Sequence, residues 1–515
     1  MNRQPSLNAE QRQCVDLALQ GHNIFLTGSA GTGKSFTLAA LTTALRDAGK
    51  RVEVTASTGI AAVCIGGVTI HAFAGFGIGN ETREELRRKA NSRKFRDIWT
   101  QVDVLILDEI SMILPDYFEK LSVVTQVARQ DNSPFGGLQV IAVGDFFQLP
   151  PVTKRLRGSV VPDSQPIFCF ETSLWKETFK HTVELRHIFR QSDPAFIECL
   201  QRIRWGKVAT EDVRMLTTRL NANVDCAGIR PTFLHSRIED VNRINQQHLE
   251  QLTGVSHTYH MVDGFIAPSS ESPEKLPPRT KIDRSVFDLR KNVPAEAELT
   301  LKVGTQVILL TNLSQEHKLV NGSRGQVVRF TETEPVYPIV RFANNEVVIR
   351  AYMWKKVFRA PAVYSYVAQI PLKLAYAYTI HKSQSQSIDF VQIQLDTSIF
   401  EEGQAYTALS RVRQLSGLTL SAFNPACIRA NPRVVAFYTS MGQNPLQKIM
   451  SRVALANQQE EEEDESEGKS GDEDDEEELE GEVDDEDAEE VEDVHIDETE
   501  DLHDHDDDED EPELE

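Results

Sequence analysis

Cysteine is scarce in this sequence, and the cysteines that occur lie far apart. The chain of 515 residues holds six of them and has no Cys-x-x-Cys pair. Such spacing argues against zinc ligation and against a disulfide framework, and it fits a reducing compartment. The six are Cys14, Cys64, Cys169, Cys199, Cys226 and Cys427.

Long hydrophobic runs are also missing. No apolar stretch reaches the roughly 20 residues that a membrane-spanning helix needs, and the N-terminus lacks an apolar signal core. We therefore expect no membrane association. The absent leader and the basic stretch Lys154-Arg155-Leu156-Arg157 favour a nuclear location, with the mitochondrion as the alternative.

Positive charge falls short of negative charge, but the deficit comes from one end of the chain. The net charge is −25, and residues 460–515 hold 37 acidic side chains and a single lysine. Residues 1–459 therefore hold 53 basic against 42 acidic side chains, a balance of +11. A basic body suits a nucleic acid, because neutralising phosphates releases bound counterions.

The acidic end is predicted to be disordered over residues 446–515, because it is highly charged and almost free of aromatic side chains. Three roles stay open for it. It could be a solubilising appendage, it could mimic DNA and bind the protein's own DNA channel, or it could dock onto a basic protein such as a histone.

Short apolar runs alternate with helical periodicity through residues 7–150. This alternation predicts an α/β sheet with helices on both faces. A charged helical stretch at residues 81–98 interrupts it and is interpreted as a small insertion. The predicted buried parallel strands are residues 23–27, 51–56, 102–107 and 139–143.

A second α/β region is predicted to start near Glu184 and to resume near Pro371. Between its two parts, residues 299–361 show short alternating strands joined by turns such as Asn321-Gly322. That pattern is typical of a small β-barrel.

A complete phosphate-binding motif, GxxxxGK[ST], follows the first predicted strand and opens a helix. Its glycines let backbone N–H groups converge on phosphates, and the helix start adds positive potential. Lys34 is predicted to reach the β- and γ-phosphates of ATP, and the Ser35 hydroxyl to ligate Mg²⁺. The motif consists of Gly28, Ser29, Ala30, Gly31, Thr32, Gly33, Lys34 and Ser35.

Two further strand ends carry polar side chains suited to phosphate chemistry. Asp108 and Glu109 follow an apolar run; Asp108 is predicted to hold Mg²⁺ through water and Glu109 to activate the attacking water. Gln148 follows the next run and could sense the γ-phosphate. By themselves, acids at a strand end or a glutamine in a turn before two prolines are ordinary structural features; the preceding P-loop favours the functional interpretation.

With these three elements, the chain resembles the PIF (petite integration frequency) family of ATP-dependent 5′-to-3′ DNA helicases, superfamily 1 class B. The resemblance runs from about Leu7 to Asn424, and its most specific piece is DYFEKLSVVTQVARQDNSPFGGLQVIAVGDFFQLPPV at residues 116–152. It implies helicase activity on single-stranded DNA and duplex junctions, in genome maintenance such as replication, repair, recombination, or telomere or organelle DNA metabolism.

The resemblance also assigns roles around ATP. Gln11 looks like the glutamine that reads adenine. Arg190 and Arg411 look like the two arginines that reach the γ-phosphate from the second domain, which makes chemical sense because a guanidinium stabilises transferring phosphate charge. Outside that family context, a lone arginine is more simply a surface ion pair.

Further motifs resemble the family's DNA-contacting segments. Ser385 departs from the family, which usually has Gly there. Phe73, and with it Phe76, could stack on bases, with core packing as the alternative. The implied DNA-contacting residues are Thr58, Gly59, His71, Phe73, Pro150, His381, Lys382, Gln384, Gln404, Tyr406, Ser410, Arg413 and Phe423.

The sequence patterns and the resemblance together predict the following domains; we expect Mg²⁺ as cofactor and a monomer. A first RecA-like domain spans 1–183 and contains a wedge insertion at 76–98, and a second spans 184–298 and 362–445. A Src-homology-three-like barrel spans 299–361, and the acidic tail spans 446–515. A P-loop kinase or nucleotide switch, and a non-catalytic nucleic-acid scaffold, are the competing interpretations.

Overall fold

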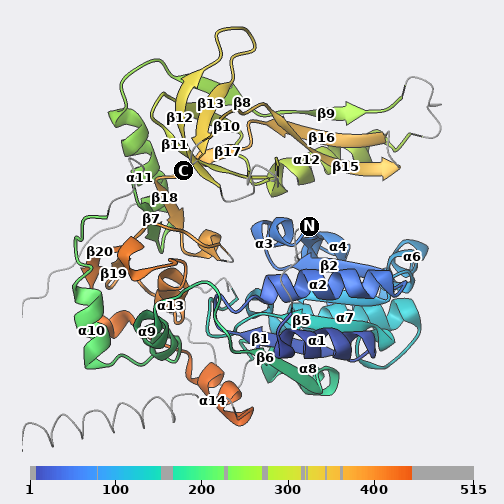
Figure 1. The fold of residues 1–515 in the computed structure, drawn as a ribbon. Coiled ribbons are helices and arrows are strands. Elements are labelled where there is room, and N and C mark those ends of the chain that lie inside the picture. The colour runs from blue at the N-terminus through green and yellow to red at the C-terminus, as the bar shows by residue number, and fades with distance from the viewer. Residues whose placement is uncertain are drawn as a thin grey trace, which may run out of the picture. The chain divides into compact units, whose positions relative to one another are not determined.

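The structure is a computed structural model, and its helices and strands fall into three groups along the chain (Figure 1). It describes residues 7–77, 79–151, 166–224, 230–268, 276–311, 313–314, 319, 323–342, 345–359, 363–384 and 386–442. Ser385, the stretch 154–157, the turn 321–322 and the tail lie outside the described residues.

The first domain is a six-stranded parallel sheet in the order β3-β2-β4-β5-β1-β6. All four predicted strands are present. Two edge strands were not predicted, and one of them, β6, pairs with β1 across the predicted boundary at 183/184; the first domain therefore extends through Leu185. The strands are β1 (Ile24–Gly28), β2 (Val52–Ala56), β3 (Val68–Thr69), β4 (Val104–Asp108), β5 (Gln139–Val143) and β6 (His181–Leu185).

Helices cover both faces of this sheet. Side chains along β1 alternate between the two faces of the sheet. Ile24 and Leu26 join the core formed with α1 and α2. Phe25 points to the other face, where its ring lies 5.0 Å from that of Trp175. The helices are α1 (Ala9–Leu19), α2 (Lys34–Asp47), α3 (Gly59–Cys64), α4 (Ile70–Phe73), α7 (Pro115–Arg129) and α8 (Ser173–Thr178).

The charged insertion predicted as a wedge forms two short helices, α5 (Arg83–Ala90) and α6 (Arg93–Thr100), which both contact α7. Thr82 and Glu85 form a capping box that starts α5. Trp99 is fully buried and anchors the insertion. The helical character of the insertion is therefore confirmed.

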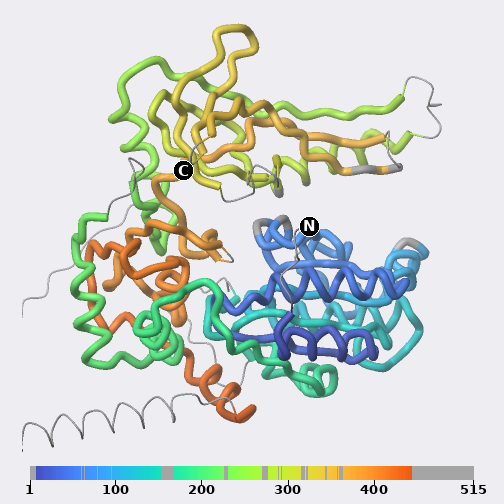
Figure 2. The backbone as a smooth tube through the Cα atoms, in the orientation of Figure 1, coloured from blue at the N-terminus to red at the C-terminus, as the bar shows by residue number. Residues whose placement is uncertain are grey.

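The second domain has a four-stranded parallel sheet in the order β18-β7-β19-β20. Its strands are β7 (Thr232–His235), β18 (Ala377–Thr379), β19 (Val391–Leu395) and β20 (Leu418–Phe423). Its helices are α9 (Pro194–Arg204), α10 (Thr210–Thr217), α11 (Ile238–Gln251), α13 (Gln404–Leu409) and α14 (Pro432–Ser440). The last of these, orange-red in the backbone tube of Figure 2, runs back to the first domain. There Phe437 stacks on Phe170, with ring centroids 4.1 Å apart.

The β-rich domain is larger than the predicted barrel at 299–361. β8 pairs with β10, β9 with β16, and β17 with β11, so both predicted boundaries cut through hydrogen-bonded sheets. The described strands from His257 to Leu374 form three sheets, β10-β8, β14-β13-β12-β11-β17 and β15-β16-β9, which together make up the β-rich unit. Its elements are β8 (His257–His260), β9 (Val262–Ile266), α12 (Arg279–Asn292), β10 (Glu298–Leu301), β11 (Gln306–Leu309), β12 (Arg324–Phe330), β13 (Pro338–Phe342), β14 (Asn345–Val348), β15 (Tyr352–Arg359), β16 (Val363–Gln369) and β17 (Leu372–Leu374).

Candidate nucleotide site and nucleic-acid interface

The P-loop connects β1 to α2 in a conformation that requires glycine. Gly31 has a φ of 86°, and a Cβ atom there would lie 2.6 Å from Cβ of Arg190 in the segment that leads into the second domain. A larger residue would therefore strain the backbone and also push that segment away.

Lys34 lies at the first position of α2. Its ammonium donates hydrogen bonds to the carbonyls of Gly28 (2.9 Å) and Ser29 (3.1 Å). Burial lowers the Lys34 pKa, and the acids Asp145 and Glu109 act against that shift. An ammonium held against the P-loop carbonyls is well placed to turn toward phosphate oxygens.

Asp108 and Glu109 lie side by side at the end of β4, both buried. The backbone N–H of Glu109 donates to Oδ1 of Asp108 at 2.9 Å, and Glu109 adopts the left-handed region at φ 52°, a conformation that non-glycine residues use rarely and mostly at functional positions. Burial, and next the charge of Glu109, raise the pKa of Asp108 to about 7.

The residues near the P-loop fit a Mg²⁺ ion bound together with phosphates. Ser35 lines the same cavity as Glu109, and the Ser35 hydroxyl and the Asp108 carboxylate are the hard oxygen donors that Mg²⁺ prefers. Within the described ranges, no group of three or more His, Cys, Asp or Glu side chains is arranged to hold a metal. A Mg²⁺ ion here would therefore depend on phosphate oxygens and water for its remaining ligands.

One cavity of about 380 Å³ joins the two α/β domains at the P-loop. Arg190 follows β6 and donates from Nη1 to the carbonyl of Ser410 at 2.8 Å. Arg411 is 1% exposed, and Nε donates to the Thr407 carbonyl at 2.8 Å. The lining comprises Ala30, Gly31, Gly33, Lys34, Ser35, Phe36, Glu109, Gln148, Phe189, Arg190, Ser387, Arg411 and Arg413.

Burial lowers the pKa values of both arginines. Burial lowers the pKa of Arg190 to about 9, and the neighbouring charge of Arg411 contributes next. Burial likewise lowers the pKa of Arg411. Because the charge of Arg411 disfavours the charged form of Arg190, an anion bound between the two would be favoured.

Gln11 is buried beside the P-loop. Its Oε1 accepts from the Asn8 backbone N–H at 3.1 Å in the capping box of α1. Its Nε2 has no hydrogen-bond partner within the part of the chain that the structure describes, and this atom lies 3.0 Å from where a Cβ of Gly33 would be. An orphan donor at the edge of a phosphate loop suits an acceptor on the base of a nucleotide.

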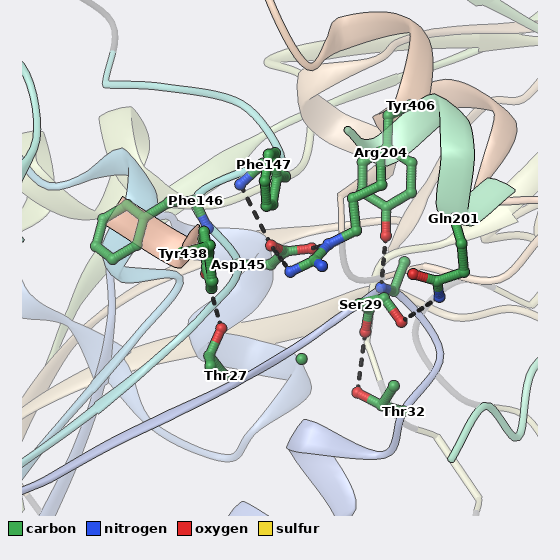
Figure 3. A network of polar contacts seen from close by, with 12 residues as sticks. Thr27, Ser29, Thr32, Asp145, Phe146, Phe147, Gln201, Arg204, Tyr406 and Tyr438 are labelled. Carbon is green, nitrogen blue, oxygen red and sulfur yellow. Dashed lines mark hydrogen bonds and ion pairs between the residues drawn. The ribbon is translucent and has the colours of Figure 1, made fainter. Parts of the chain in front are cut away.

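A network of polar contacts links the P-loop side of the first domain to α9, α13 and α14 of the second (Figure 3). The Tyr406 hydroxyl accepts from the Ala30 backbone N–H at 2.8 Å. Gln201 donates from Nε2 to the Ser29 hydroxyl at 3.0 Å. The two domains therefore contact each other directly around the phosphate loop.

The predicted DNA-contacting residues of the first domain are accessible in part. Thr58 is half-buried and its hydroxyl accepts from the Ala61 N–H at 3.2 Å, and Gly59 is exposed. His71 is half-buried with its ring 4.7 Å from that of Tyr117, and Phe73 is half-buried against Trp99 at 5.0 Å. Pro150 is half-buried.

Phe76 differs from its neighbours in this segment. It is 5% exposed, and its ring stacks on that of Tyr117 at 5.0 Å. Core packing, the alternative that the sequence left open, therefore describes Phe76, and base stacking by this residue is not supported.

His381, Lys382 and Gln384 follow β18 in the second domain. Burial lowers the pKa values of His381 and Lys382, and the charge of Lys373 lowers that of Lys382 further. Gln384 is 6% exposed and donates from Nε2 to Oε2 of Glu109 at 2.9 Å. The structure thus places Gln384 on the candidate general base and not on a surface open to DNA.

The last predicted DNA-contacting motif is mostly interior in this structure, and its assignment to DNA stays a prediction. Gln404 and Ser410 are 0% and 1% exposed, and Tyr406 is bonded to the P-loop. Arg413 lines the nucleotide cavity and pairs with Asp389 at 3.2 Å. Phe423, at the end of β20, is half-buried.

Sequence reasoning missed the residues that join the domains. Asp145 lay within a quoted motif but received no role, and an acid directly after a buried strand beside a P-loop is a usable signal. Arg204, Gln201 and Tyr438 carry no local signal, because their partners lie 59 or more positions away in the chain.

The chain matches known protein families over two of its segments. Residues 6–214 match the PIF1-like helicase family, and residues 288–330 match the 2B domain of the DNA helicase Pif1. The ATP-dependent DNA helicase PIF1 of Xenopus laevis is 41% identical over 443 residues, which cover 86% of this chain and 65% of that protein. The chain therefore spans a little less than two thirds of this curated relative.

Solved structures agree with the sequence comparison. The crystal structure of the Pif1 helicase from Candida albicans has a TM-score of 0.69 and 36% identity, covering 85% of this chain and 100% of that chain. Pif1 from Bacteroides in complex with ADP-AlF3 and ssDNA has a TM-score of 0.60 and 29% identity, covering 85% and 99%. The nucleotide cavity, the β-rich insertion and these similarities together establish that the chain belongs to the PIF1-like helicase family.

Proposed function

We propose that this protein is a DNA-dependent ATPase that moves along single-stranded DNA and unwinds duplex or structured DNA in the 5′-to-3′ direction. One observation carries the proposal: a single cavity is lined by the P-loop and Glu109 from the first domain and by Arg411 from the second. A nucleotide bound there would contact both domains, so binding and hydrolysis would close and open the cleft.

The proposed steps follow from these positions. Glu109 activates the attacking water, Lys34 and Arg411 stabilise charge on the transferring phosphate, and Mg²⁺ would be held by Ser35 and, through water, by Asp108. Each domain then grips the DNA backbone in turn, and phosphate contacts give grip without sequence choice. The direction of travel comes from the family resemblance alone.

DNA as the track is supported by the basic body of the chain and by the Bacteroides relative solved with ssDNA. Accessible candidates for the track are His381, Lys382, Thr58 and Phe73. A P-loop kinase or switch would need neither the Arg190 and Arg411 pair at the cavity nor the 2B domain.

The decisive experiment measures unwinding of matched duplexes that carry either a 5′ or a 3′ overhang, together with ATP hydrolysis with and without single-stranded DNA. We expect strong stimulation by DNA and unwinding from the 5′ overhang only. Lys34→Ala serves as the matched control and should lose both activities. Hydrolysis that is indifferent to DNA, with no strand displacement, would refute the motor.

Several finer points belong to the same proposal. We propose that the protein works as a monomer in DNA replication, repair or recombination, and that it acts in the nucleus. No described helix is long and apolar enough to cross a membrane. Fluorescence localisation of the full-length natural protein would test the compartment, and sedimentation would test the monomer.

For the acidic tail we propose a solubilising role, with mimicry of DNA and docking onto a basic protein as rivals. Deleting residues 459–515 and measuring DNA affinity against salt separates them. A solubilising tail leaves affinity unchanged at low salt. A mimic competes for the channel, so its removal strengthens DNA binding most at low salt, where charge is least screened.

A further inference from the structure

A buried ion pair between Arg204 and Asp145 joins the two α/β domains (Figure 3). Arg204, at the end of α9, donates from Nη2 to Oδ1 of Asp145 at 2.8 Å and from Nε to Oδ2 at 3.1 Å. Asp145 follows β5 of the first domain. The two side chains are 3% and 0% exposed, so each charge depends on the other for its compensation.

The Asp145 carboxylate and carbonyl also shape the turn that leads to Gln148. Oδ1 accepts from the Phe147 N–H at 3.2 Å, and the carbonyl accepts from the Gln148 N–H at 3.0 Å. Gln148 in turn lines the cavity beside the P-loop. The position of Gln148 is therefore set by the residue that Arg204 binds.

The surroundings of the pair hold Arg204 in one orientation. Its guanidinium lies 4.5 Å from the ring centre of Phe147 and 5.2 Å from that of Tyr438. The Tyr438 hydroxyl is 2.8 Å from that of Thr27, at the end of β1, and accepts from the Phe146 N–H at 3.2 Å. The two rings stack on each other with centroids 4.8 Å apart, so the planar cation contacts this stacked pair while both of its hydrogen bonds to Asp145 fix its direction.

We propose that Arg204 is a positioning residue for hydrolysis: through Asp145 it holds the turn that presents Gln148 to the γ-phosphate, so that the placement of the second domain sets the geometry of the phosphate sensor in the first. This inference rests on the proposed function, since it needs a γ-phosphate to be sensed. Arg204 touches neither nucleotide nor DNA in this role.

The same helix offers a matched control. Arg202, two residues earlier, makes a buried pair with Asp212, from Nε at 2.8 Å and Nη2 at 2.7 Å, with exposures of 8% and 0%. It also lies 3.4 Å from Glu211 and 3.8 Å from Glu198. Both members of that pair lie in the second domain. Arg202→Gln therefore breaks a comparable ion pair on α9 without touching the contact between the domains.

The test compares Arg204→Gln with Arg202→Gln in the full chain. For Arg204→Gln we expect kcat of DNA-stimulated ATP hydrolysis to fall about tenfold or more, and the Kd of a non-hydrolysable ATP analogue to rise. The Kd of ADP, which has no γ-phosphate, should stay within about twofold. Arg202→Gln should lower the melting temperature similarly and leave these three quantities near wild type.

Two further variants keep the test valid if a lone buried Asp145 prevents folding. Arg204→Lys keeps the charge without the paired geometry and should restore part of kcat. The double variant Asp145→Asn/Arg204→Gln removes both charges, so it should fold and still hydrolyse slowly.

The results separate the inference from the proposed function. If wild-type protein hydrolyses ATP without any response to DNA, the proposed function fails before Arg204 is considered. If wild-type protein behaves as a motor and Arg204→Gln matches Arg202→Gln in kcat and in both affinities, the pair is merely structural and the inference is overturned. Equal loss of ADP and ATP-analogue binding would overturn it too.

Discussion

Gln384 and Glu109 are joined by a hydrogen bond across the cleft, with Nε2 of the amide 2.9 Å from Oε2 of the carboxylate. The second domain thereby contacts the candidate general base in this structure. The same bond would have to loosen for Glu109 to turn fully to an attacking water.

Replacing Gln384 with Met should weaken the dependence of hydrolysis on DNA. A hydrogen bond to a charged group contributes roughly 1.5–3 kcal/mol, so the basal ATPase rate should rise roughly tenfold while the DNA-stimulated rate changes less. Steady-state ATPase assays with and without DNA measure both. Gln392→Met, on β19 of the same domain, is the control, and a parallel fall of both rates would contradict the prediction.

Tyr406→Phe should impair nucleotide binding and spare DNA binding. The hydroxyl accepts from the Ala30 N–H at 2.8 Å, and its loss leaves a buried donor unpaired at a cost of about 1–3 kcal/mol. We expect ATP affinity to fall about fivefold or more, with the Kd for single-stranded DNA unchanged.

The control for Tyr406 is Tyr376→Phe. That hydroxyl accepts from the Gln306 N–H at 3.1 Å, far along the chain from the P-loop. Fluorescence titrations with labelled nucleotide and labelled oligonucleotide decide. A selective loss of DNA affinity in Tyr406→Phe would contradict this expectation and would support contact between Tyr406 and DNA.

Asp108→Asn should stabilise the metal-free protein while abolishing Mg²⁺-dependent hydrolysis. The folded pKa of Asp108, about 7, lies above its unfolded value, so its contribution favours folding at low pH and is lost as pH rises through 7. Asparagine removes the cost of a buried charge, so urea unfolding in chelator at pH 8 should show a gain of roughly 2–4 kcal/mol. The gain should fall to about half near pH 5.5; a gain that grows on acidification would refute it.

Gly403→Ala should separate the two domains. A Cβ there would lie 2.4 Å from the Phe147 carbonyl oxygen and 2.6 Å from that of Gln148, at a φ of 74°. Gly442 has the same φ with no atom within 4 Å of its Cβ position, so Gly442→Ala reproduces the backbone strain alone. We expect about tenfold slower hydrolysis in Gly403→Ala only; equal effects would assign the loss to strain.

Local patterns predicted the part of the site that a short stretch of chain can build. Strand, glycine loop and helix are contiguous, so the sequence alone predicts a site at residues 28–35 and at the acids after β4, and the structure brings Gly31, Lys34 and Glu109 to one cavity. The contacts between domains were not predictable, because Thr27 meets Tyr438 and Ala30 meets Tyr406 across 411 and 376 positions.

The errors at domain edges have one physical cause. β6 joins the first sheet, and β9 and β17 join the β-rich unit, through backbone pairing that side-chain patterns do not encode. Tyr406, Gln404 and Ser410 were placed on DNA because their motif resembled a contact segment. The structure shows these three side chains buried, a property that the motif itself does not reveal.

The helix α14 ends at Ser440, and its Tyr438 is fastened to Thr27 at the base of the P-loop. A force that acts on the end of this helix would therefore reach β1, the strand that leads into the P-loop. Tension on α14 would then be expected to change the affinity of the P-loop for a nucleotide.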